Sequence, residues 1–106
     1  MMDSPLDGRI GRRLREARIA AGLTMREAAS SAGIPNHSLL VRYENGTARP
    51  PLDRLAALAS AYDTTLAAIL AERDEAVALI TAIEQASPAT LQRLLRALDL
   101  AADHSG

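Results

Sequence analysis

Hydrophobic residues recur along the chain at intervals of three and four, the spacing that places them on one buried stripe of an α-helix. The first stripe predicts a helix over residues 9–21, with Ile10, Leu14, Ala17 and Ala21 as its members. Two prolines prevent the loop at 47–51 from continuing as helix, and the next stripe holds Leu52, Leu55, Leu58, Ala59 and Tyr62. Thr65 can cap a further helix from Leu66, which can continue as one helix toward Ala86.

The segment between the first two stripes holds the signals of two short helices joined by a glycine turn. Thr24 and Glu27 form a capping-box pattern that starts one helix, and Gly33 ends it. Asn36 can cap a second helix that runs to Glu44. Proteins use this layout to present the second helix to the major groove of DNA.

The last third of the chain predicts two more helical segments. Ser87 followed by Pro88 is a start signal, so residues 71–102 are expected to form an antiparallel helical hairpin. The apolar faces of this hairpin exceed what a small five-helix module needs to cover, which favours a dimer interface. A hairpin folded back on its own domain is the alternative. The residues expected in the dimer interface are Val77, Ile80, Ile83, Leu91, Leu94, Leu95 and Leu98.

Composition favours an all-α protein. Almost half of the residues are hydrophobic, but most of these are Ala and Leu, and Tyr43 and Tyr62 are the only aromatic residues. The absence of cysteine excludes disulfides and thiolate metal sites and fits a reducing compartment. We expect residues 1–8 to be a flexible leader and 103–106 a flexible tail. No cationic region followed by an apolar run opens the sequence, and no apolar stretch approaches the ~20 residues of a membrane span, so a cytoplasmic protein with no membrane contact is expected.

The charges are segregated along the chain although the net charge is only −1. Residues 9–54 hold nine arginines against four acidic residues, a local net charge of +5, and the remaining residues carry −6. This asymmetry indicates a basic N-terminal module that meets a polyanion, with ordinary solvated helix faces as the alternative.

An enzyme is the least supported class of function. The only histidines are His37 and His104, and the sequence has no glycine-rich phosphate loop and no cluster of His, Cys and carboxylate residues. No catalytic, cofactor-binding or metal-binding residue is therefore expected, and no cofactor.

The ordered residues from 9 to 70 resemble the lambda and 434 repressor- and Cro-like, or Xre-type, helix-turn-helix family. The matching residues are Ile10-Gly11, Leu14-Arg15, Arg18, Gly22-Leu23-Thr24, Ala29, Gly33-Ile34, Tyr43-Glu44-Asn45-Gly46, Pro50, Leu55, Leu58-Ala59, Tyr62 and Leu66 to Leu70. The resemblance implies an all-α fold in which a five-helix repressor-like domain at 9–70 is followed here by the C-terminal hairpin.

The same resemblance implies a sequence-specific DNA-binding transcriptional regulator, such as a repressor. Its third helix, at about 37–44, would enter the major groove of a palindromic double-stranded operator, with the protein bound as a homodimer. The rival hypothesis is a protein-interaction module of the same fold, an antitoxin or adaptor that holds a protein partner through its C-terminal helices.

Carried over residue by residue, the resemblance assigns roles to specific side chains. Arg18 and Glu44 match the family's structural ion pair, and Leu40 and Tyr43 should face the core. The base-reading positions are His37, Ser38, Val41 and Arg42. The positions expected near DNA phosphates are Thr24, Met25, Arg26, Asn36 and Arg49, the last with an ordinary solvated arginine as the alternative.

Two departures from the family pattern bear on these assignments. The chain has one residue more than usual between Gly33 and Glu44, and Pro35 in the turn is the expected extra residue. If the extra residue lies inside the helix instead, Leu39 becomes buried and the reading face rotates by about 100°. Met25 stands where many relatives carry a glutamine that bonds phosphate, and it cannot make that bond.

Overall fold

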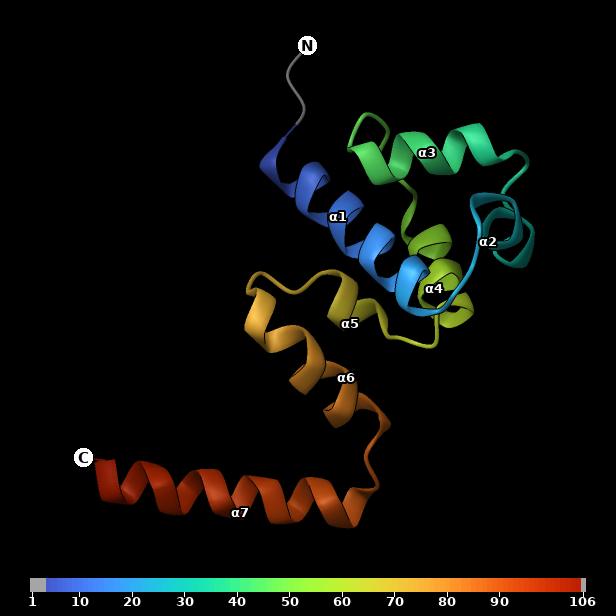
Figure 1. Ribbon diagram of the computed structural model, residues 1–106. Helices are drawn as coiled ribbons and strands as arrows, with labels where there is room; N and C mark the ends of the chain where they lie inside the picture. Colours follow the sequence, from blue (N-terminus) through green and yellow to red (C-terminus); the bar gives the residue numbers. More distant parts are fainter. Residues whose placement is uncertain (1–3, 106) are drawn as a thin grey trace.

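The computed structural model describes residues 4–105, with the side chains of 4–102, and these residues are all-helical (Figure 1). The helices are α1 (Pro5–Ala20), α2 (Met25–Ser31), α3 (His37–Asn45), α4 (Leu52–Ala61), α5 (Leu66–Ile69), the short 3-10 helix η1 (Asp74–Ala76), α6 (Val77–Gln85) and α7 (Pro88–Ser105). Helices α1 to α5 form one unit, α6 lies against α5, and α7 extends away from the rest. The all-α, helix-turn-helix fold with additional C-terminal helices is confirmed.

The helices of the central segment begin where the sequence predicts. The Thr24 hydroxyl accepts a hydrogen bond from the Glu27 N–H (3.1 Å) and the Glu27 carboxylate accepts one from the Thr24 N–H (3.0 Å), which completes the capping box of α2. The Asn36 side chain accepts from the Leu39 N–H at 2.9 Å and starts α3. Gly46 ends α3 in the left-handed conformation, with φ of 76°.

One hydrophobic core holds α1 to α5 together. Leu14 of α1, Leu40 of α3 and Leu58 of α4 are fully buried at its centre. The other buried members are Ile10, Ala28, Ala29, Ile34, Tyr43, Leu55, Ala59, Tyr62 and Ile69. Because α1, α3 and α4 each contribute a central leucine, the orientation of α3 is set by the core itself.

Helices α1 and α3 approach each other closely at Gly11. A Cβ atom at this position would lie 2.4 Å from the carbonyl oxygen of Glu44 and 2.6 Å from that of Tyr43. Only a residue without a side chain allows the two helix backbones this approach.

The N-terminal helix is longer than the sequence analysis expects. It begins at Pro5 instead of residue 9, because Ser4 caps it by accepting a hydrogen bond from the Asp7 N–H at 3.0 Å. Residues 5–8 of the expected flexible leader therefore belong to α1, and the rest of the leader lies largely outside the described residues. At the other end, α7 continues through 103–105, which were expected in a flexible tail, and residue 106 lies outside the described part.

The expectation of one helix from Leu66 to Ala86 is wrong. Helix α5 ends at Ile69, the chain turns through residues 70–73, and α6 starts at Val77. The turn places α6 against α5, where a continuous helix would carry the same residues away from the domain.

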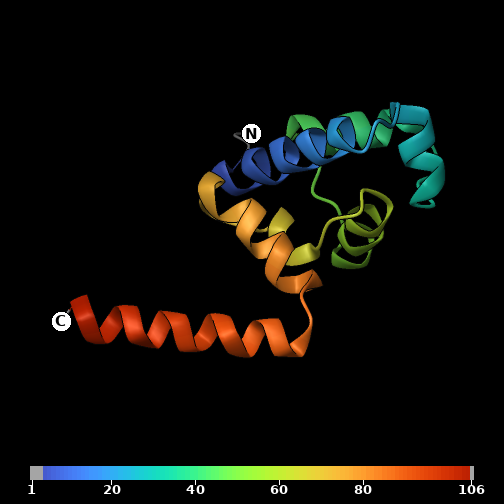
Figure 2. The same ribbon diagram turned by 60° about the horizontal axis from the view of Figure 1, so that its bottom comes forward.

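The two C-terminal helices diverge instead of packing along each other. Figure 2 shows α7 leaving the end of α6 at Ala86-Ser87 as one arm of an open V. Ser87 caps α7 by accepting from the Thr90 N–H at 3.2 Å. The leucine side of α7 therefore lacks the cover that an antiparallel hairpin within one chain would give it.

Candidate nucleic-acid interface

Helix α3 separates its residues cleanly into a buried and an exposed side. Leu40 is fully buried and Tyr43 is buried beside it. His37, Ser38 and Arg42 are exposed on the opposite side, and the other expected base-reading residue, Val41, is half-buried.

The start of α3 at His37 places Pro35 in the turn before the helix, where the sequence analysis puts the extra residue. Leu39 is half-buried and packs on the edge of the core, while the centre is occupied by Leu40. The outward side of α3 is therefore the one that the alignment backward from Glu44 predicts.

A buried ion pair fixes the C-terminal end of α3 to α1. The Arg18 Nε donates to Glu44 Oε2 at 2.7 Å and its Nη2 donates to Oε1 at 3.2 Å, while Nη1 donates to the Leu23 carbonyl at 3.0 Å. The Glu44 side chain is 2% exposed and that of Arg18 is 13% exposed. The hydrogen bonds from Arg18 to the Glu44 carboxylate raise the pKa of Arg18 above its ordinary value. One guanidinium thus joins α1, α3 and the turn after α1.

Arg54 provides a second polar link to α3 that the sequence analysis does not identify. Its Nη1 donates to the Tyr43 hydroxyl at 2.9 Å, which ties the core side of α3 to the start of α4. The family resemblance assigns Tyr43 only to the core, and nothing in the spacing of the sequence points to Arg54 as its partner.

The candidate phosphate-contacting residues gather at the start of α2 and around the turn to α3. A shallow hollow of about 450 Å³ brings Arg26 of α2 together with Asn36 and His37 at the start of α3, and its other lining residues are Ala29, Ser30, Ile34 and Pro35. Met25 is half-buried and packs on the core. The Thr24 N–H and the Thr24 hydroxyl oxygen are both engaged in the capping box, and the exposed Arg26 adds a positive charge to this surface.

Arg49 lies in the loop after α3 and pairs with a residue of α1. Its Nε donates to Asp7 Oδ1 at 2.8 Å and its Nη2 donates to Oδ2 at 3.0 Å. These hydrogen bonds lower the pKa of Asp7. The Arg49 side chain stays 66% exposed, so its guanidinium lies at the surface although one side of it is occupied. Asp7 lies 42 residues from Arg49, and no local pattern in the sequence relates the two positions.

The residues expected in a dimer interface lie on α6 and α7 and differ in exposure. Val77, Ile80 and Leu91 are half-buried. The exposed members are Ile83, Leu94, Leu95 and Leu98. The four leucines of this set in α7 lie three or four residues from one another along one helix side, and Leu95 and Leu98 are 61% and 66% exposed.

Two further properties of the described residues bear on the class of site. The part of the chain from 4 to 105 contains no group of three or more His, Cys, Asp or Glu residues that could hold a metal ion. In the same part, every helix is too short or too polar to cross a membrane.

A family model described as a helix-turn-helix domain matches residues 9–76. No curated protein matches the chain. The family match begins within α1, includes α2, α3, α4 and α5, and reaches the end of η1, so it covers the elements that form the core and the exposed side of α3. It confirms the helix-turn-helix resemblance, and this protein belongs to the helix-turn-helix domain family of DNA-binding regulators.

Proposed function

We propose that this protein is a sequence-specific transcriptional regulator that binds a palindromic operator as a homodimer, with α3 in the major groove. The observation that carries the proposal is the fixed orientation of α3. Leu40 and Glu44 hold it from inside the domain, and His37, Ser38 and Arg42 are left outside. A cytoplasmic location follows from this function.

The chemistry of the exposed residues suits direct reading of base edges. The Arg42 guanidinium can donate two hydrogen bonds to O6 and N7 of a guanine. His37 and Ser38 can each make one hydrogen bond to a base or a phosphate, and Val41 can pack on a thymine methyl group. Arg26 and Arg49 supply cations for phosphates on either side of α3. The backbone N–H groups of Met25 and Asn36 and the hydroxyl hydrogen of Thr24 are the further donors at the helix starts.

The test of DNA binding is the selection of genomic fragments by the purified protein, followed by titration of the retained sequence at several salt concentrations. We expect a palindromic sequence and an affinity that falls steeply with salt, with a logarithmic slope of about −0.9 for each phosphate neutralised. Failure to retain any fragment, or an affinity independent of salt, would refute the proposal.

Two arginine variants separate base reading from phosphate contact. Arg42→Ala should weaken operator binding by about 1–3 kcal/mol and relax the preference at one base pair. Arg49→Ala should weaken binding to all sequences alike, because a phosphate contact carries no sequence information. Equal losses on operator and random DNA for both variants would remove Arg42 from the base-reading set.

The exposed leucines on one side of α7 favour a second copy of this chain as the partner that covers them. An isolated amphipathic helix is only marginally stable in water, and α7 packs along none of the other helices that the structure describes (Figure 1). An antiparallel pair of α7 helices would bury Leu94, Leu95 and Leu98 of both copies. It would also bring Arg93 and Arg96 of one helix beside the half of the partner helix that holds Asp99.

Sedimentation of a variant with Leu95→Ser and Leu98→Ser tests this interface. The variant should sediment as a folded monomer at concentrations where the original protein is a dimer, with Leu100→Ser, on the opposite side of α7, as the control. A variant that stays dimeric would exclude this side of α7 as the dimer interface.

A protein-interaction module is the second candidate function. Leu79 of α6 and Leu100 of α7 are 66% and 61% exposed and lie outside the set assigned to the dimer. A protein partner held by the C-terminal helices would cover these residues. This function is favoured if the purified chain binds no DNA but its dimer recruits such a partner through α6 and α7.

A further inference from the structure

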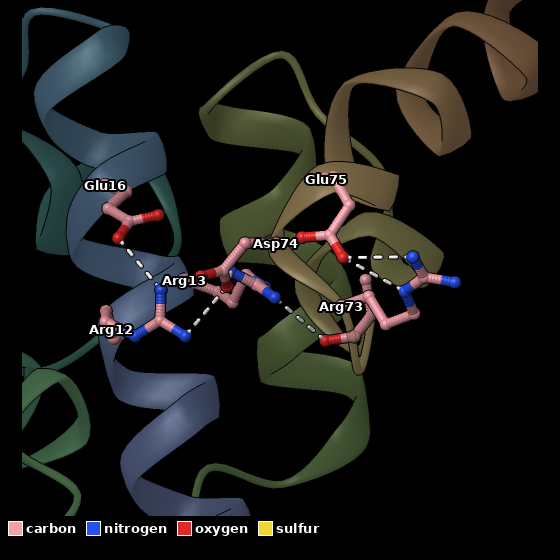
Figure 3. Close-up of polar contacts among 7 residues, drawn as sticks. Arg12, Arg13, Glu16, Arg73, Asp74 and Glu75 are labelled. Carbon is pink, nitrogen blue, oxygen red and sulfur yellow. Dashed lines mark hydrogen bonds and ion pairs between the residues drawn. The ribbon is translucent and has the colours of Figure 1, made fainter.

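Three side chains join the DNA-binding domain to the start of the C-terminal helices. Figure 3 shows Arg12 and Arg13 of α1 converging on Asp74, the first residue of η1. Arg12 Nη2 donates to Asp74 Oδ1 at 3.0 Å, and Arg13 Nη1 donates to the same oxygen at 2.7 Å. We call these three residues the Asp74 clamp.

The two arginines of the clamp have different surroundings. Arg12 is at the surface and also donates to Glu16 at 3.2 Å. The Arg13 side chain is only 3% exposed, and its Nη2 donates to the Ala71 carbonyl at 3.3 Å. Arg13 therefore holds both the chain leaving α5 and the residue that opens η1. The Asp74 side chain is 67% exposed, so it serves the domain through this contact and not through burial in the core.

The other links between α6 and the domain are weaker or lie farther along the chain. The Thr64 and Thr81 hydroxyls are 3.4 Å apart, and the Gln85 amide donates to the Asp63 carbonyl at 3.5 Å, the outer limit of a hydrogen bond. Apolar packing of α6 on the short helix α5 is less directional than hydrogen bonds from two guanidinium groups to one carboxylate. Such packing therefore fixes the direction of α6 less well. The Asp74 clamp is the charged contact between α1 and the residues that open η1, immediately before α6.

We propose that Asp74 is a positioning residue that determines which half-site spacing the dimer accepts. The inference rests on the proposed function, in which each copy of α3 reads one half-site and the C-terminal helices join the copies. Successive base pairs are rotated by about 35°, given roughly 10–10.5 base pairs per turn, so one added base pair demands a different angle between the two domains. If the connection between the domain and the C-terminal helices is rigid, the dimer cannot adopt the new angle between its two domains. If the connection is flexible, the dimer can adopt that angle.

The chain offers a matched control beside the clamp. Glu75 pairs with Arg73 at 3.1 Å, and both side chains are strongly exposed. The hydrogen bond joins Arg73, at the end of the turn, to the second residue of η1, and neither of its partners belongs to α1 (Figure 3). Glu75→Gln removes one negative charge from the same segment, as Asp74→Asn does, but leaves the clamp intact.

The experiment measures the affinity of the full chain for the operator retained by genomic selection and for versions with one base pair added to or removed from its centre. The original protein and Glu75→Gln should prefer the retained spacing strongly. In Asp74→Ala the preference should fall by about tenfold, while the preference for half-site sequence stays unchanged. A spacing preference in Asp74→Ala equal to that of the original protein would overturn the inference. Asp74→Asn, which keeps the size and an acceptor oxygen, serves if loss of the whole side chain prevents folding.

A second measurement needs no DNA and so separates this inference from the proposed function. The chain has no cysteine, so Ala56→Cys in α4 and Ala82→Cys in α6 place two spin labels on exposed positions. Pulsed electron paramagnetic resonance, with labelled chain diluted in unlabelled chain, gives the distribution of distances between the two spin labels. We expect a narrow distribution for the original protein and Glu75→Gln, and a broad one for Asp74→Ala. An unchanged width in Asp74→Ala would also overturn the inference, whether or not the protein selects DNA.

Discussion

The contact between α1 and α3 at Gly11 makes a quantitative prediction for the variant Gly11→Ala. The added Cβ would lie 2.4 Å and 2.6 Å from two carbonyl oxygens of α3 and 2.9 Å from the Glu44 carbonyl carbon. Ordinary contacts begin near 3.4 Å, so the two helices must separate by about 1 Å. All three atoms belong to backbone, and no side chain can rotate away to make room.

The expected cost follows from two opposing terms. Overpacking of a well-filled interior costs about 1–3 kcal/mol, and a clash with helix backbone belongs near the upper end of that range. Alanine in place of glycine inside a helix gains about 1 kcal/mol of helix propensity. The free energy of unfolding should therefore fall by about 2 kcal/mol.

The matched control is Gly8→Ala in the same helix. A Cβ at Gly8 meets no atom within 4 Å, so only the favourable propensity term applies and stability should rise by up to about 1 kcal/mol. Urea denaturation of both variants, followed by circular dichroism at the helix band, measures the two changes. The two substitutions should have opposite signs, and a Gly11→Ala variant as stable as Gly8→Ala would refute the close approach of the helices.

Three further predictions concern other contacts of the domain. Glu44→Ala should lower the free energy of unfolding by about 3–5 kcal/mol in urea denaturation, because it leaves the Arg18 charge unpaired in a largely buried position. A loss below about 1 kcal/mol, the value of an exposed ion pair, would contradict a structural role for this pair. Asn36→Ala should cost about 1 kcal/mol by removing the cap of α3, measured in the same way, and no loss would mean that another group caps the helix. The pKa of Asp7 is lowered by Arg49, so its carboxylate stabilises the fold above its ordinary pKa of 3.8, and this contribution is lost as the pH falls through the lowered value. Asp7→Asn should therefore be less stable than the original protein at neutral pH and equally stable in strong acid, and a gap that persists in acid would assign its effect to something other than this charge.

Local signals in the sequence predicted much of the domain. The capping box at Thr24 and the cap at Asn36 specify helix starts through side chains only three residues away, and both are found in the structure. The 3-4 spacing of apolar residues likewise placed Leu14 and Leu58 inside, and the family resemblance placed Leu40 there. Such features depend on one or two helical turns, and the neighbouring residues are enough to interpret them.

Features that depend on partners far along the chain were not predictable in the same way. Asp74 lies 61 residues from Arg13, and no periodicity relates the two positions. The direction of α7 depends on the turn at Ala86, because the stripe of leucines specifies only which side of the helix is apolar. The start of α1 differs, because its signal is local: Ser4-Pro5 is the same start signal as Ser87-Pro88, but no apolar stripe covers residues 5–8.

The three consecutive residues at 11–13 of α1 serve two different interfaces. Gly11 meets the backbone of α3, and Arg12 and Arg13 hold Asp74 before α6. A boundary for module exchange therefore does not lie at the end of α5, although the five-helix unit ends there. A chimaera that takes its C-terminal helices from a relative must also take the matching surface of α1. Otherwise the contacts that Arg12 and Arg13 make with Asp74 are lost, and the transferred helices are no longer held against α1.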